Sequence, residues 1–246
     1  PLDQFQIIAI YSLKLKILDV SFTNLILIGI IGLLFLNYII LFSSKNNSFF
    51  FIPHNWQTII ENINEITSTL LYDNIIKKAE KYFPFFSMLF IFIIIVNLIG
   101  LIPYSFTITS HLIITFTISL SIFIGVNIVG FKKFKTQLLS LFLPANSSFD
   151  LALLLVPIEF ILYFFKPISL GVRLFANLMA GHTLLKVIIG FAWSILLLKN
   201  LLSIFHIIPL IIVIVLFVLE FSVALIQAYV FIILSCIYLN DCINLH

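Results

Sequence analysis

One arginine lies inside a long apolar stretch of this chain. Residues 149–239 are almost continuously apolar, and Arg173 stands among them. A charged side chain at the centre of a bilayer costs about 2.5–3.5 kcal/mol on insertion scales, so such a group normally faces a protein interior or a watery cavity. Unlike lysine, arginine keeps its proton when it is buried. A fixed positive charge of this kind is suited to holding or passing a partner carboxylate without taking up its proton.

The same stretch carries further polar side chains that could move a proton. Carboxylates occur toward its two ends, and amides and a histidine lie between them together with Arg173. Carboxylates and histidine exchange protons whereas arginine does not, so the set is typical of a proton relay interrupted by a positive barrier. The residues alone therefore predict an intramembrane proton or ion path. The polar members are Glu159, Lys166, Asn177, His182, Lys186, His206, Glu220 and Gln227, with Asp241 just beyond the end of the stretch.

Helical spacing sorts the residues around Arg173. Asn177 follows at i+4, on the same helix face. Ala176 and Ala180 keep that face small, which allows a neighbouring helix to approach closely. His182 is nine positions from Arg173, about 180° around an ideal helix, so it is expected to serve a different environment.

The other candidates divide between the two ends of the stretch. Glu220 and Gln227 are seven residues apart and share one stripe of the last helix. Asp241 ends that helix near an interface. Glu159 begins the helix that carries Arg173, on the side of a lysine-rich loop.

Each of these side chains also has a purely structural interpretation. Arg173 could form a buried ion pair with Glu220, although apolar packing could replace such a pair at little loss. Glu159 could pair with Tyr163 or Lys166, at i+4 and i+7.

Structural roles stay open for the remaining polar groups too. Asn177 and Gln227 could join helices by hydrogen bonds, which are worth under ~1 kcal/mol on average in membranes. Lys166, Lys186 and Lys199 could extend their ammonium groups to an interface. His182 could have a structural role as well.

Composition assigns the class of protein. The chain has 246 residues, of which 62% are hydrophobic and 9% charged, and its net charge is +3. A soluble globule of this size has too little polar surface to cover so much apolar side chain, so a soluble enzyme is excluded. A disordered tail and a nucleic-acid binder are excluded as well, because no basic stripe is dense enough to follow phosphates. Of thirteen basic residues, only Arg173 is not a lysine.

Hydropathy then predicts an all-α polytopic membrane protein that forms one membrane domain over residues 1–246. The lysines after the first and third spans place the N-terminus outside by the positive-inside rule. From the residues alone, 149–239 holds either four spans or two very long tilted helices. The chain begins with Pro1 rather than Met, which leaves a removed leader open, and its start lacks the pattern of a signal peptide. The expected segments are an N-terminal segment at 1–21, spans at 22–42, 84–104 and 108–131, and an amphipathic surface helix at 54–82.

Two motifs in the apolar stretch resemble a known family. Residues 169–182, SLGVRLFANLMAGH, are similar to the signature of subunit a of the rotary (F-type) ATP synthases, in its mitochondrial form. Residues 219–221 (LEF) and 226–231 (IQAYVF) resemble the second signature. The resemblance covers the whole chain and includes residues 1–5 (PLDQF), 102–106 (IPYSF), 111–112 (HL) and 238–246 (YLNDCINLH).

The resemblance implies a fold and a role for each candidate. It implies five membrane helices plus the amphipathic helix, the last two long and strongly tilted, at 149–198 with Arg173 and at 203–241 with Glu220. Arg173 would face a rotating ring of small subunits, keep each passing carboxylate ionised and block a direct leak. An outer half-channel would be lined by Asn177, His182, Glu220 and Gln227, and a matrix-side half-channel would involve Glu159, with Asp241 as a further member.

Partners and location follow from the same resemblance. The expected partners are the ring of proteolipid c subunits, peripheral-stalk and other membrane-sector subunits, and the lipid bilayer, with no nucleic acid. The expected location is the mitochondrial inner membrane, which the chain would cross several times. We expect no cofactor and no metal. The chain has no GxxxxGK[ST] motif, so no nucleotide site is expected on it.

Two other classes of membrane protein remain as alternatives. A haem- or quinone-binding respiratory subunit would need histidines facing each other at matching depth, and His182 is the only histidine deep in an apolar span. A secondary transporter would show inverted repeats, and the sequence has no internal repeat.

Overall fold

A computed structural model describes residues 5–12, 14–15, 18–19, 21–45, 55–74, 79–102, 105–135, 149–197 and 205–243. Some of the sequence-based expectations, including that for Lys199, fall outside these residues. The helices are α1 (Asn24–Lys45), α2 (Asn55–Asn74), α3 (Ala79–Leu101), the 3-10 helix η2 (Ile108–Ser110), α4 (Leu112–Phe134), α5 (Phe149–Leu196) and α6 (Ile207–Ile243). The strands are β1 (Ala9–Tyr11), β2 (Lys14–Leu15), β3 (Leu18–Asp19) and β4 (Phe22–Thr23).

The chain is an all-α polytopic membrane protein, as its hydropathy predicts. Within the described residues, four helices are long and apolar enough to cross a membrane: α3, α4, α5 and α6. Helix α1 adds a shorter described apolar stretch, Asn24–Tyr38. Helices suit these sequences because a helix satisfies its backbone hydrogen bonds internally where lipid offers no partners. The first span at 22–42 and the single membrane domain stay predictions.

Helix α2 differs in character from the apolar helices. Its exposed positions include Glu61 and Glu65, while Leu70 and Leu71 are buried. Exposed acidic side chains together with a buried apolar pair are typical of a helix that lies at a surface rather than crossing a membrane. This helix occupies the first two thirds of the predicted amphipathic segment, and residues 79–82 form the start of α3 instead.

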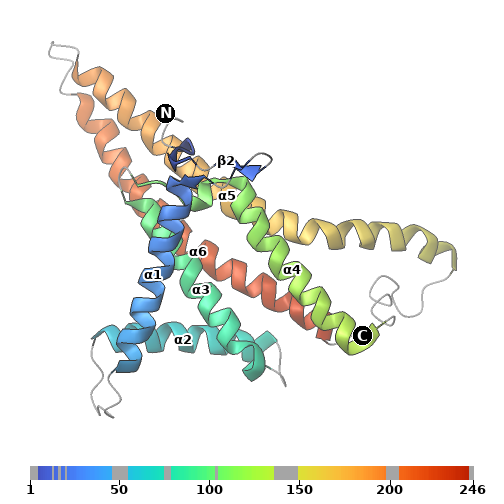
Figure 1. Cartoon of the computed structure of the whole chain (residues 1–246). Coiled ribbons are helices and arrows are strands. Elements are labelled where there is room, and N and C mark those ends of the chain that lie inside the picture. Colours follow the sequence, from blue (N-terminus) through green and yellow to red (C-terminus); the bar gives the residue numbers. More distant parts are fainter. Residues whose placement is uncertain are drawn as a thin grey trace. The chain divides into compact units, whose positions relative to one another are not determined.

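The long apolar stretch forms two helices rather than four. Helix α5 has 48 residues and α6 has 37 (Figure 1). Helix α5 stays continuous through Pro157 and Pro167, although each proline removes one backbone hydrogen-bond donor. The residues alone could not decide between these arrangements, because an uncharged turn between two spans has the same hydropathy as an unbroken helix.

Two short antiparallel strand pairs near the N-terminus were not expected from the sequence. Strand β1 pairs with β4, and β2 pairs with β3. Asn24, the first residue of α1, joins this helix to the segment before β1 by three hydrogen bonds. Its backbone N–H donates to Ile8 O (3.1 Å), its Nδ2 donates to Gln6 O (3.2 Å), and its Oδ1 accepts from Ile8 N (3.3 Å). The segment before β1 is thereby fastened to the start of α1.

The chain divides into two compact units that interleave along the sequence. Unit 1 contains residues 1–50, 91–111 and 174–228, and unit 2 contains 51–90, 112–173 and 229–246. Helices α3, α5 and α6 each contribute one part to either unit. In unit 1, Leu174, Leu178, Ala224 and Ala228 are buried, at the i, i+4 spacing of one helix face.

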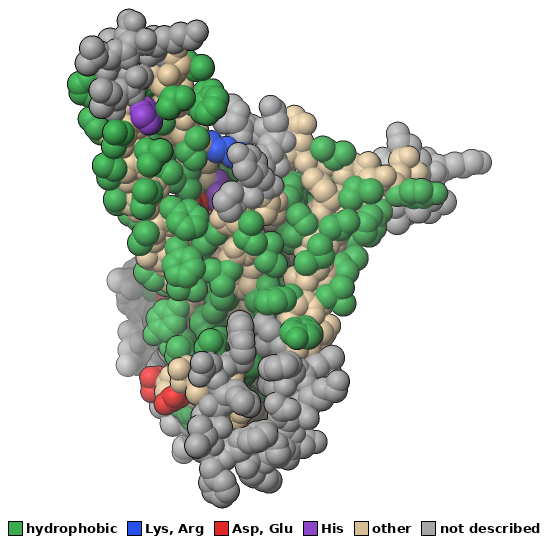
Figure 2. Space-filling view, turned by 90° about the vertical axis from the view of Figure 1, so that its left-hand side faces the viewer, with side chains coloured by type: hydrophobic (Ala, Val, Ile, Leu, Met, Phe, Trp, Pro, Cys, Tyr) green, Lys and Arg blue, Asp and Glu red, His purple; other side chains and the backbone are tan. Residues whose placement is uncertain are grey.

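Large apolar side chains also cover much of the outer surface of α5 and α6. Leu153 is 72% exposed, Val187 61% and Val218 60%. Figure 2 shows hydrophobic side chains over most of the described surface on one face of the molecule. Such a surface suits lipid or apolar partner helices rather than water.

Gly171 sets how closely α5 approaches α4 within unit 2. A Cβ at this position would lie 2.8 Å from Ser119 Oγ, and 3.1 Å from both Phe116 Cα and Thr115 O. Phe116 Cα and Thr115 O are backbone atoms of α4, so they cannot move away by a change of rotamer as a side chain can. The absence of a side chain at Gly171 therefore permits this helix contact.

Gly171→Ala should destabilise the chain, because the added methyl forces α4 and α5 apart. Overpacking of this kind costs about 1–3 kcal/mol in the free energy of unfolding. Thermal unfolding of the purified chain in detergent checks this. Gly125→Ala, in α4, is the matched control because nothing lies within 4 Å of a Cβ built there. Equal unfolding temperatures for the two variants would contradict the close-contact explanation.

Candidate functional site

The centre of the candidate site in unit 1 is a contact between α5 and α6. His182 Nδ1 lies 3.2 Å from Glu220 Oε1, and the two side chains are only 11% and 5% exposed. In this unit the two helices run antiparallel, since Asn177 contacts Gln227 and His182 contacts Glu220 further along. A buried carboxylate is costly unless it has a partner or carries a proton. The contact therefore joins two groups that can each hold a proton.

Glycine at position 181 makes room for the carboxylate. A Cβ on Gly181 would lie 2.8 Å from Glu220 Oε1 and 3.0 Å from its Cδ. The carboxyl group thus lies directly against the backbone of α5, beside His182. Any side chain at position 181 would compete with Glu220 for this space.

A cavity of about 240 Å³ opens beside the pair. Water occupies about 30 Å³ in the liquid, so the volume is sufficient for several molecules where polar groups are present. Asn177 and Glu220 supply those groups, and Asn177 Nδ2 donates a hydrogen bond to Gln227 Oε1 at 2.9 Å. The rest of the lining is small or apolar: Leu178, Ala180, Gly181, Leu184, Leu185, Leu216, Leu219 and Val223.

Asn97 is a polar residue of unit 1 that the sequence analysis missed. It lies in α3, is 1% exposed, and donates from Nδ2 to Ala224 O at 3.2 Å. Its Oδ1 is buried without a hydrogen-bond partner among the described residues. The signal was present in the sequence, since Asn97 interrupts an apolar span just as Asn177 does. It was missed because one uncharged amide in an apolar span is a weaker signal than a carboxylate.

Arg173 lies in unit 2, at the boundary where α5 passes into unit 1. Its side chain is exposed, and within the described residues of unit 2 no carboxylate lies at ion-pair distance from it. The guanidinium cannot be neutralised by losing its proton. Arg173 therefore keeps a fixed positive charge that no described carboxylate of its unit neutralises.

Lys166 and Asp241 form an ion pair within unit 2. Lys166 Nζ lies 3.0 Å from Asp241 Oδ2, with the two side chains 33% and 40% exposed. The ammonium group also lies over the rings of Tyr163 and Tyr238, at 5.6 Å and 5.1 Å from their centroids. The alternative that paired Lys166 with Glu159 is therefore wrong. The tertiary fold brings Asp241 from α6 to Lys166, and sequence spacing within α5 could not reveal that partner.

Tyr163 connects further polar groups of unit 2. Its hydroxyl donates to Asn127 Oδ1 of α4 and lies 3.8 Å from Cys242 Sγ. Glu159 is one turn before Tyr163 on α5, and its Oε2 is buried without a hydrogen-bond partner among the described residues. Asn127 and Tyr238 were not singled out from the sequence because neither is charged.

The candidate residues thus fall into two groups. Asn177, His182, Glu220 and Gln227 come together in unit 1. Glu159, Arg173 and Asp241 belong to unit 2. Within the part of the chain that the structure describes, no three His, Cys, Asp or Glu side chains converge as metal ligands. The arrangement suits acid–base exchange of protons between side chains and water.

Comparison of the sequence with known proteins shows which family the chain resembles. The family model described as ATP synthase A chain matches residues 25–240. ATP synthase subunit a of Pylaiella littoralis is 50% identical over 252 residues, which cover 100% of this chain and 98% of the relative. The subunit a of Chondrus crispus is 46% identical over 246 residues, covering 100% of this chain and 96% of the relative. That of Paramagnetospirillum magneticum is 40% identical over 253 residues, covering 100% and 99%.

Gly181→Ala should move the Glu220 carboxyl away from His182, because the added methyl would otherwise lie 2.8 Å from Glu220 Oε1. The helix itself should persist, since alanine favours helix more than glycine does. A high-resolution structure of the variant checks this by the distance from His182 Nδ1 to Glu220 Oε1. Gly190→Ala is the control on the same helix, because nothing lies within 4 Å of a Cβ there. An unchanged distance in Gly181→Ala would refute the steric role of Gly181.

Proposed function

Since this chain belongs to the ATP synthase A chain family, we propose that it is the static, proton-conducting subunit of the membrane sector of a mitochondrial ATP synthase. Two aqueous half-channels would deliver protons to and from carboxylates on a rotating ring, so that proton flow drives ATP synthesis. The observation that carries the proposal is the buried His182–Glu220 contact beside a cavity in an apolar surrounding.

Proton uptake in the outer half-channel uses the residues of unit 1. Water in the cavity brings a proton to Glu220 and His182, whose contact lets the proton pass between them. Asn177 and Gln227 hold each other by a hydrogen bond at the cavity wall. From this site the proton moves to a ring carboxylate, which can then enter lipid because it is uncharged.

Arg173 separates the uptake and release paths. A ring carboxylate that returns without its proton is attracted by the guanidinium, which is exposed and without a carboxylate partner among the described residues of its unit. Because arginine does not release its proton, no proton passes through this position. The membrane potential supplies about 2.3 kcal/mol per charge per 100 mV to the overall transfer.

Glu159 is the proton acceptor of the matrix-side half-channel in this proposal. Its Oε2 is buried without a hydrogen-bond partner among the described residues, so it has room to accept. Asp241 has a supporting role, as the carboxylate that pairs with Lys166 at 3.0 Å. We place both on the release side.

The proposed partners are the ring of small proteolipid c subunits and the peripheral-stalk and other membrane-sector subunits. The apolar outer surfaces of α5 and α6 are compatible with a neighbouring ring and with lipid. We propose the mitochondrial inner membrane as the location, and five membrane helices with α1 as the first. The long helices α5 and α6 would then be strongly tilted beside the ring.

Arg173→Ala should abolish ATP-driven proton pumping while the enzyme still assembles, because the fixed charge that attracts the ring carboxylate is lost. Pumping by the whole ATP synthase in inverted membrane vesicles checks this, with assembly followed on native gels. Arg173→Lys distinguishes a fixed charge from any positive charge, since a lysine in this setting can lose its proton. Normal pumping in Arg173→Ala would overturn the proposed function.

Glu220→Gln should slow proton flux by about 10-fold or more, because the amide keeps the shape of the side chain but cannot exchange a proton. The same vesicles provide the measurement, normalised to the amount of assembled enzyme. Glu220→Asp retains the carboxyl group and should keep more flux than Glu220→Gln. Wild-type flux in Glu220→Gln would remove Glu220 from the relay.

A further inference from the structure

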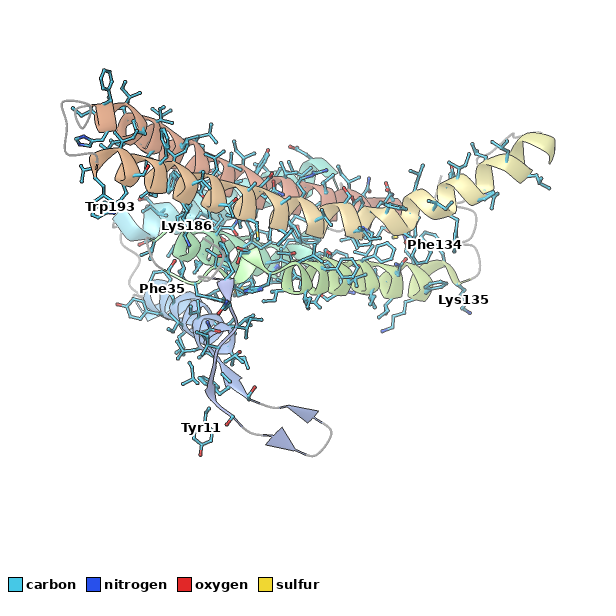
Figure 3. The ribbon with its side chains drawn as sticks, turned by 90° about the horizontal axis from the view of Figure 1, so that it is seen from above. Tyr11, Phe35, Phe134, Lys135, Lys186 and Trp193 are labelled. Atoms are coloured by element: carbon cyan, nitrogen blue, oxygen red, sulfur yellow. The ribbon has the colours of Figure 1, made fainter. Side chains whose placement is uncertain are left out.

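A side chain from the start of the chain lies against the candidate uptake site. Phe5 is 8% exposed, and its ring centroid lies 6.4 Å from that of His182, with the two planes inclined by 52°. Lys186, one turn beyond His182 on α5, places its Nζ 5.2 Å from the centroid of the Phe5 ring. Figure 3 labels Lys186 on α5. All three residues belong to unit 1.

Phe5 is the single inward-facing side chain of its segment. Among residues 5–12 it alone is buried, whereas Ile7 is 53% exposed and Ile8 62%. A segment that served only as an apolar cover would be expected to bury more than one of its large side chains. Within residues 5–12, burial is therefore confined to Phe5, the side chain next to His182.

The segment is held in place by contacts that do not involve the site. The three hydrogen bonds that join Asn24 to Gln6 and Ile8 fasten the residues directly after Phe5. The pairing of β1 with β4 continues this attachment to the start of α1. The residues directly after Phe5 are therefore held by α1 and β4, in addition to the contacts that the Phe5 ring makes with α5.

We propose that Phe5 is a positioning residue of the outer proton site, and this rests on the proposed function. Its ring covers one side of His182, keeps the imidazole against Glu220 and directs water to the pair through the cavity beside Gly181. Among the described residues, the charged groups that face His182 are Glu220 from α6 and Lys186 from α5 itself. The Phe5 ring attracts the Lys186 ammonium group to its own face, which fixes where that charge lies. Excluding water strengthens the interaction between His182 and Glu220.

The test compares three substitutions of Phe5 in the whole ATP synthase, using inverted membrane vesicles and rates normalised to assembled enzyme. Phe5→Ala should lower ATP-driven pumping by about 2- to 10-fold and shift its pH profile by about half a pH unit or more, because His182 and Glu220 meet more water. Phe5→Tyr keeps the ring and should match the wild type. Phe5→Leu keeps apolar cover without the ring face, so its rate should lie between the two.

Ile8→Ala is the matched control, because this side chain is exposed on the same segment. Asn24→Ala is a second route to the same effect, since it loosens the segment without touching the site. It should shift the pH profile in the same direction as Phe5→Ala. A wild-type rate and profile in Phe5→Ala would overturn the proposal. A lower rate with an unshifted profile would overturn it too, because that is the result of a merely structural role.

Glu220→Gln and Arg173→Ala in the same vesicles separate this proposal from the proposed function. If both retain normal pumping, the proposed function itself fails. If both lose pumping while Phe5→Ala equals the wild type, only the role of Phe5 fails.

Discussion

A carboxylate in an apolar surrounding needs a partner close at hand, and the structure of unit 1 is organised around that need. Glu220 is 5% exposed and has His182 at 3.2 Å. That distance requires α5 and α6 to lie side by side, and Gly181 leaves room for it, since a Cβ there would lie only 2.8 Å from Glu220 Oε1. A cavity of about 240 Å³ lies beside Glu220. The packing of α5 against α6 and the absence of a side chain at Gly181 therefore both accommodate the Glu220 carboxyl group, and the cavity lies beside it.

The ionisable residues of α5 and α6 differ in how their charge is accommodated, and the difference agrees with their chemistry. Glu220 and His182 can change protonation and are largely buried together. Lys166 and Asp241 are partly exposed and paired with each other. Arg173, which cannot change protonation, is exposed and has no carboxylate partner among the described residues of its unit. Titratable groups that are buried can relay protons, whereas an exposed fixed charge can attract an anion.

Much of the fold was predictable, because apolar length and charge placement report directly on membrane helices. Helices α3 and α4 lie near the predicted spans, and α2 occupies most of the predicted amphipathic segment. The undecided region was 149–239, since hydropathy does not distinguish two long helices from four short ones. The N-terminal strands were missed because two- and three-residue strands have no detectable periodicity. In the site, Asn97 and Asn127 were missed because uncharged polar residues are weaker signals than carboxylates.

The sequence by itself determined the class of protein, the family, and the list of groups able to carry or block a proton. These depend on composition and local motifs, and the lone arginine among thirteen basic residues is the clearest case. Only the tertiary structure decided which groups meet: Glu220 with His182, Lys166 with Asp241, and Phe5 with His182. The physical reason is that such contacts join residues far apart in the chain. Helical periodicity relates a residue to its neighbours within one helix and contains no information about the side chain that faces it from another.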